Sequence, residues 1–152
     1  IIYISIYLLM NLSFFSGLFM LKRNDKYFET IDDLSGLSKN HPILSLALLI
    51  SLFSLAGIPP LAGFFAKFYI FIAVIEKELY FLAIIGLLST VVAAFYYLRI
   101  IKTIYFDSSL EKFDSKHGIG LKISLCVSTL LVLFYFIFPS VLTSVISRIT
   151  IL

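Results

Sequence analysis

Charged residues are scarce in this sequence: only 14% of its 152 residues are Asp, Glu, Lys or Arg, against about a quarter in an ordinary soluble domain. The net charge of +3 comes from residues clustered in a few polar stretches. Nucleic-acid binding needs a continuous basic face, and the sequence contains none. We therefore expect no nucleic-acid partner.

Cysteine is nearly absent as well. The one cysteine, Cys126, lies inside an apolar run. A single cysteine cannot form an intrachain disulfide, and Cys126 lacks the companions that a zinc or iron-sulfur site requires. The sequence also contains nothing that resembles a nucleophile-base pair or a phosphate-binding glycine loop. We therefore expect no cofactor and no metal in this chain.

Apolar residues dominate what is present: they make up 61% of the chain, and its mean hydropathy is +1.06. Such a chain could not cover a water-facing surface, and a backbone in lipid must satisfy its hydrogen bonds internally, which favours helices. The sequence therefore predicts a single all-α integral membrane domain over residues 1–152. The predicted spans are 1–21, 42–75, 79–106 and 121–147, and the predicted polar loops are 22–41 and 107–120.

The second apolar run is too long for one straight helix. As a continuous helix, residues 42–75 would reach ~50 Å and overshoot a hydrocarbon core of about 30 Å. Two consecutive prolines, Pro59 and Pro60, follow Gly57 and precede Gly63. Each proline removes a backbone donor and clashes with the preceding turn. We therefore predict a helix break at residues 57–62.

The distribution of charge bears on whether this break interrupts one span or separates two. If it interrupts one span, the basic stretches 22–41 and 99–120 share one membrane face, in agreement with the positive-inside bias. Two separate spans would place them on opposite faces. We favour four crossings, with the basic loops facing the matrix or cytoplasm and both termini on the other side.

Lys67 is the candidate functional residue. It lies nine residues before Glu76, or about 13 Å along a helix, which is close to the middle of a membrane. A cation at that depth is costly, and a broken helix at membrane depth marks ion sites in transporters. We infer that Lys67 loads and releases a proton. The alternatives are that it snorkels from a shallower depth or pairs structurally with an acid on another chain.

No acidic residue lies inside any predicted span, so the partners of a proton path must come from elsewhere. Within this chain, hydroxyl groups in the spans are candidates for ordering water near Lys67. The candidates are Ser51, Ser54, Tyr69, Ser89, Thr90, Tyr96 and Tyr97.

Several segments resemble one known family. They are Asp32-Asp33-Leu34-Ser35-Gly36-Leu37, His41-Pro42, the run from Ser54 to Phe64, Lys67-Phe68-Tyr69 and Ala93-Ala94-Phe95-Tyr96-Tyr97-Leu98-Arg99. They resemble the C-terminal part of NADH dehydrogenase subunit 2, the antiporter-like subunit called N in bacterial respiratory complex I.

The resemblance implies a proton-translocating subunit of the membrane arm, the C-terminal part of an antiporter-like helical bundle, in which Lys67 serves as the proton relay. It implies no redox chemistry in this chain. The partners would be the remaining spans of subunit 2, on a separate chain or in a missing N-terminal part, other antiporter-like and small membrane subunits, and membrane lipids. The composition favours a mitochondrial inner membrane, with a bacterial plasma membrane as the alternative.

Two further functions remain open. A subunit of an Mrp-type cation/proton antiporter resembles the same superfamily and would also keep a lysine after a broken helix. A structural scaffold that no longer pumps is the third possibility, and it would leave Lys67 dry and paired, or exposed at an interface.

Overall fold

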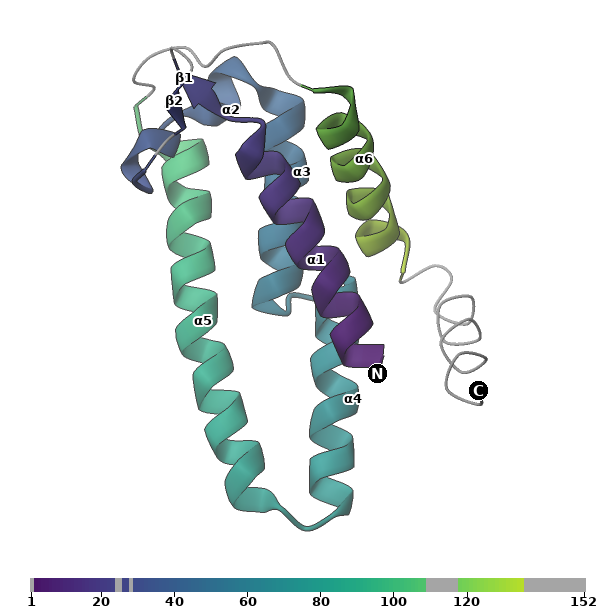
Figure 1. Cartoon of the computed structure of the whole chain (residues 1–152). Coiled ribbons are helices and arrows are strands. Elements are labelled where there is room, and N and C mark those ends of the chain that lie inside the picture. The colour runs from purple at the N-terminus through teal and green to yellow at the C-terminus, as the bar shows by residue number, and fades with distance from the viewer. Residues whose placement is uncertain (1, 24–25, 28, 109–117, 136–152) are drawn as a thin grey trace.

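The secondary structure of the described part of the chain is helical, apart from one short β-ladder. The computed structural model describes residues 2–23, 26–27, 29–108 and 118–135 (Figure 1). The helices are α1 (Ile2–Phe19), the 3-10 turn η1 (Asp32–Leu34), α2 (Leu37–Asn40), α3 (Pro42–Ala56), α4 (Ala62–Glu76), α5 (Tyr80–Phe106) and α6 (Ile119–Phe134). The strands β1 (Lys22–Arg23) and β2 (Lys26–Tyr27) pair antiparallel.

Two of these helices, α1 and α5, are long and apolar enough to cross a membrane by length and composition, whereas α3 and α6 are shorter apolar helices. The predicted last span, 121–147, overlaps α6 as far as Phe134, and its remainder beyond residue 135 lies outside the described residues. Helices α3 and α4 together occupy the predicted second span, and the chain between them is non-helical at residues 57–61.

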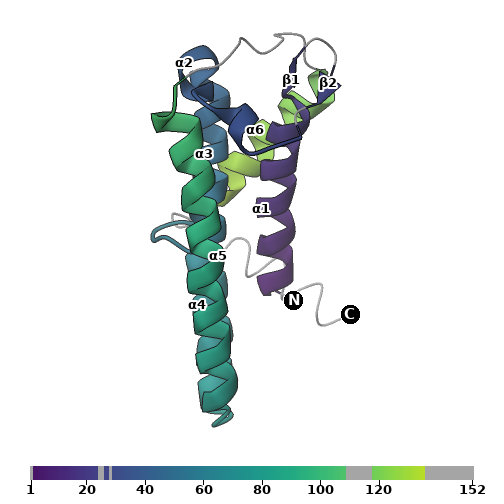
Figure 2. The same cartoon turned by 90° about the vertical axis from the view of Figure 1, so that its left-hand side faces the viewer.

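The helices form an elongated bundle. In Figure 1, α3 descends from the end of the bundle that holds α2, and after the break α4 continues in the same general direction. Helix α5 returns beside both, and the view turned by 90° shows the same relationship (Figure 2). Helices α1 and α6 pack on each other and on α3. The lower halves of α4 and α5 extend past α1 in Figure 1, and many of their apolar side chains are exposed.

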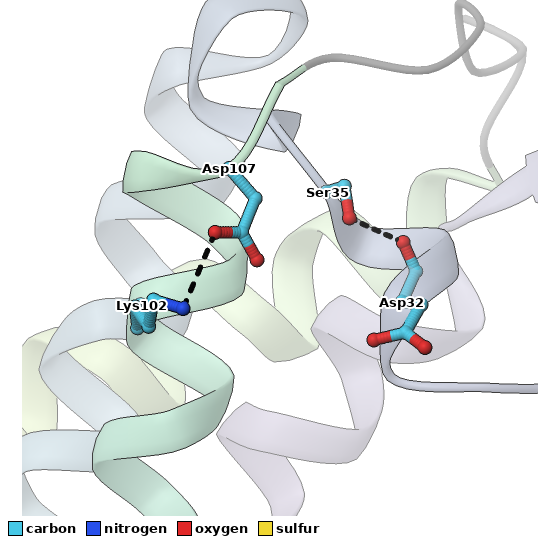
Figure 3. Close-up of polar contacts among 4 residues, drawn as sticks. All are labelled: Asp32, Ser35, Lys102 and Asp107. Carbon is cyan, nitrogen blue, oxygen red and sulfur yellow. Dashed lines mark hydrogen bonds and ion pairs between the residues drawn. The ribbon is translucent and has the colours of Figure 1, made fainter.

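The connections that precede α3 and the end of α5 gather at one end of the bundle. The backbone N–H of Gly36 donates to the carbonyl of Thr103 at 3.1 Å, which ties the connection before α3 to the last turns of α5. Nearby, Lys102 pairs with Asp107 at 3.7 Å, and the Ser35 hydroxyl donates to the Asp32 carbonyl at 2.5 Å (Figure 3). The connections that precede α3 and follow α5 therefore lie on the same side of the bundle.

Small hydroxyl side chains join α1, α3 and α6 in the interior. The hydroxyl of Ser13 lies 2.6 Å from that of Ser51 and 2.7 Å from that of Thr129, and the Ser16 hydroxyl lies 2.9 Å from that of Ser124. Small residues let membrane helices approach closely, and their hydroxyls then bond across the interface. The small polar residues of α1 therefore serve helix packing.

Replacing Ser13 by alanine should destabilise the bundle modestly. The hydroxyl joins three helices and is fully buried, and a hydrogen bond between membrane helices contributes about 0.6 and at most about 1.7 kcal/mol. We expect a loss near 1 kcal/mol, measured by denaturant unfolding of the complete subunit in detergent. The matched control is Ser89→Ala, since the exposed Ser89 hydroxyl bonds only within its own helix, to Gly86. Equal stability of the two variants would contradict this role.

Candidate functional site: a lysine at a broken helix

Local sequence explains where α3 ends. Gly57 adopts a left-handed conformation with φ of 87°, which costs glycine little. Its N–H bonds to the carbonyl of Ser54 at 3.0 Å, and the N–H of Ile58 bonds to that of Phe53 at 3.0 Å. This pair of bonds is a Schellman motif. Pro59 and Pro60 follow in the exposed turn, where neither could continue the helix.

The Schellman motif satisfies the carbonyls of Phe53 and Ser54 and leaves the last two carbonyls of α3 to other donors. Lys67 supplies them: its Nζ donates to the Leu55 carbonyl at 2.9 Å and to the Ala56 carbonyl at 3.3 Å. The C-terminus of a helix carries a partial negative charge that attracts cations. The half-buried ammonium therefore sits where the backbone of α3 offers it both acceptors and a favourable dipole.

A second contact joins the two half-helices. The backbone N–H of Gly63, in the first turn of α4, donates to the Ser54 hydroxyl at 2.9 Å. No side chain at the start of α4 provides such a cap, so a serine of the preceding half-helix takes that role. A Cβ on Gly63 would lie 1.8 Å from the Ser54 carbonyl oxygen. The two half-helices touch backbone to backbone, and only glycine fits there.

Two cavities adjoin Lys67. The larger, about 310 Å³, lies between α4 and α5, and the smaller, about 180 Å³, lies between α1 and α5. Both are lined by Tyr3, Ser89 and Thr90 in addition to Lys67. Since a water molecule occupies about 30 Å³ of liquid and needs polar partners, each cavity can hold several waters beside the amine.

The sequence-predicted hydroxyl groups separate into three sets. Ser89, Thr90 and Tyr97 line the cavities at Lys67, and Tyr97 lines the smaller of the two. Ser54 and Ser51 are buried in helix contacts, at the break and against Ser13 respectively. Tyr69 and Tyr96 are 46% and 55% exposed and line neither cavity.

Two tyrosines of α1 were not among the predicted residues. Tyr3 and Tyr7 both line the smaller cavity, and their rings stack with centroids 5.9 Å apart. Their spacing of four residues places them on one face of a helix, and this spacing is visible in the sequence. It shows that they share a face of the helix, but it does not show that this face is turned toward Lys67.

Comparison with known proteins identifies the class. Residues 1–93 match the family described as NADH:quinone oxidoreductase/Mrp antiporter, TM. Over all 152 residues the chain is 74% identical to NADH-quinone oxidoreductase subunit N of Pelagibacter ubique, covering 32% of that protein. It is 47% identical over 141 residues to the subunit N of Rhodospirillum rubrum, covering 93% of this chain and 29% of that protein.

A solved structure shares the fold. A chain of respiratory complex I from Thermus thermophilus with bound aureothin superposes with a TM-score of 0.80 at 25% identity, over 93% of this chain and 33% of that one. The chain thus spans about a third of the length of the relatives it matches. Because the family match covers more than half of its residues, this chain belongs to the NADH:quinone oxidoreductase/Mrp antiporter transmembrane family.

Proposed function

We propose that this chain is the C-terminal part of subunit N of a proton-pumping NADH-quinone oxidoreductase, respiratory complex I. The observation that carries the proposal is 74% identity along the whole chain with subunit N of Pelagibacter ubique. In this role the chain contributes to proton translocation in the membrane arm. The redox cofactors, the NADH site and the quinone site of the complex would belong to other subunits.

Lys67 is the proposed proton relay. When it is protonated, its ammonium donates to the Leu55 and Ala56 carbonyls, where the dipole of α3 favours positive charge. When it is neutral, that electrostatic attraction is lost. The neighbouring cavities supply space and hydroxyl groups for water that carries the proton to and from the amine. Proton loading and the contact between α3 and α4 are therefore coupled.

The proposed topology has four crossings. In it, α3 and α4 form one interrupted span, because α4 continues in the direction of α3 and α5 returns beside both (Figure 1). The bond from Gly36 to Thr103 supports this arrangement, in which the basic connections share one membrane face. The positive-inside bias assigns that face to the cytoplasm. The relatives reported above are bacterial, which favours the bacterial plasma membrane over the mitochondrial inner membrane.

The proposed partners are the earlier spans of subunit N and the neighbouring membrane subunits of the complex. The relatives are about three times as long as this chain, and within the described residues the contacts of Lys67 are backbone carbonyls. A proton relay requires further titratable groups, which those earlier spans would supply. Membrane lipids would cover the apolar surface that these partners leave free.

An Mrp-type antiporter subunit is the second candidate, since the family description names both classes. The subunit N relatives favour complex I. A scaffold without a pumping role is favoured less, because the cavities lined by Ser89 and Thr90 place polar space beside Lys67.

Purification of the complete subunit from its native membrane distinguishes these functions. With an affinity tag on the subunit, we expect NADH-oxidising and iron-sulfur subunits to co-purify, together with quinone reductase activity that drives proton uptake in reconstituted vesicles. Co-purification with a small set of antiporter subunits and no dehydrogenase would instead assign the chain to the Mrp class.

A further inference from the structure

A groove on the surface of the bundle is not used by the proposed proton path. It has a volume of about 520 Å³ and lies between α3 and α6, and Lys67 is not among the residues that line it. Its walls are apolar, and none of the described residues that line it is acidic. The wall residues include Ile43, Leu46, Ala47 and Ile50 of α3 and Leu125, Cys126 and Leu130 of α6.

The groove is left open by the described part of the chain. Ile43 is 84% exposed, Leu46 is 52% exposed and Leu130 is 46% exposed, and Cys126 is exposed as well. Apolar side chains that line a concave surface of this kind bind an apolar ligand. The occupant must therefore present hydrocarbon to α3 and α6.

The length of the groove fits one leaflet of a bilayer. From Ile43 to Ile50 the α3 wall extends about 10 Å, and from Lys122 to Leu130 the α6 wall extends about 12 Å. Half of the hydrocarbon core is about 15 Å. A lipid acyl chain within one leaflet matches this length.

The mouth of the groove is polar and cationic. Asn40, His41 and Lys122 line it, and Lys122 is an exposed residue of the first turns of α6. This is the end of the bundle that carries the polar connections (Figure 1). Basic pockets between membrane helices on this side attract anionic headgroups.

We propose that this groove, defined by α3, α6 and Lys122, binds an anionic glycerophospholipid. One acyl chain lies between Ala47 and Cys126, and the phosphate of the headgroup pairs with the Lys122 ammonium. The site lies outside the Lys67 cavities and requires that the groove face lipid in the complete subunit. Its occupancy is therefore independent of whether the subunit pumps protons.

Photo-crosslinking tests this site. The complex that contains the complete subunit is reconstituted in phosphatidylcholine vesicles. Each sample also contains a trace of one probe lipid that carries a diazirine on one acyl chain, and this probe is either phosphatidylglycerol or phosphatidylcholine. Labelling of the segments 42–50 and 122–130 is measured by mass spectrometry. A basic residue near the membrane surface contributes about 1 kcal/mol toward an anionic lipid, so phosphatidylglycerol should label these segments about fivefold more.

Three variants complete the test. Lys122→Gln should remove the preference for phosphatidylglycerol, and Cys126→Trp should reduce labelling by both lipids because it fills the groove. Lys102→Gln, which removes an exposed lysine at the same end of the bundle that does not line the groove, should keep the preference. Equal labelling by the two lipids, the same loss in Lys102→Gln as in Lys122→Gln, or no labelling of segments 42–50 and 122–130 by either lipid would each overturn the proposal.

Discussion

Gly63→Ala should prevent α3 and α4 from packing closely against each other at the break. The added Cβ would lie 1.8 Å from the Ser54 carbonyl oxygen, 2.7 Å from its carbonyl carbon and 2.8 Å from the Met10 sulfur. Two of these atoms belong to the backbone, so rotation of a side chain cannot relieve the overlap. Overpacking of a core costs about 1–3 kcal/mol and more when the backbone must move. We expect the free energy of unfolding to fall by about 3 kcal/mol or more. The hydrogen bond from Gly63 to Ser54 should be lost as well.

Gly120→Ala provides the matched control. It makes the same chemical change in the first turn of α6, where nothing lies within 4 Å of an added Cβ. Alanine is favoured over glycine in a helix by about 1 kcal/mol, so this variant should be neutral or slightly stabilised. Both variants of the complete subunit are compared by thermal unfolding in detergent and by the amount of assembled protein in membranes. If Gly63→Ala behaved like Gly120→Ala, the close approach of α3 and α4 would be wrong.

The helix break could be predicted because its causes are local. Consecutive prolines at positions 59 and 60 exclude a continuous helix whatever surrounds them, and the structure has the chain non-helical at residues 57–61. Helix α4 begins at Ala62, the last residue of the predicted break, and Gly63 lies in its first turn. The Ser54 hydroxyl caps that turn from another helix, and no local pattern encodes such a contact.

The surroundings of Lys67 could be predicted only in part. Adjacent residues on a helix point about 100° apart, and Tyr97 lines a cavity at Lys67 whereas Tyr96 lines neither. The sequence identified the pair but not which member faces Lys67. Thr90 and Tyr97 are seven residues apart and share a face of α5, and both line the smaller cavity. Tyr3 was missed because its proximity depends on the packing of α1 against the break.

The partners of Lys67 were also not predictable from the sequence. The sequence predicted that the partners of a proton path come from elsewhere, since no acidic residue lies inside any predicted span. The structure brings the amine to the Leu55 and Ala56 carbonyls, because the five-residue break lets the first turns of α4 pass beside the end of α3. The lysine therefore both stabilises the break and occupies the proposed proton path, and these two roles need separate tests.

Lys67→Met and Lys67→Arg separate these roles. Methionine has no N–H group, so the Leu55 and Ala56 carbonyls lose the donor that Lys67 supplies. Leaving a buried acceptor without a donor lowers stability by about 1–3 kcal/mol. Arginine keeps a cation for the end of α3, but a guanidinium stays protonated in proteins and does not release its proton near pH 7. It can stabilise the break, yet it cannot exchange protons.

We therefore expect both variants to lose the proton translocation carried by this subunit, whereas stability falls mainly in Lys67→Met. Proton uptake per quinone reduced is measured in vesicles that contain the assembled complex, and thermal unfolding is measured in parallel. Lys77→Met is the control, because it removes an exposed lysine ten residues further along, at the end of α4, without touching the break. Normal proton uptake in Lys67→Arg would show that the cation is structural and that the proton is carried elsewhere. Loss of uptake in Lys67→Arg with normal thermal stability would establish proton exchange at this amine, because the charge and its contact with α3 would remain in place.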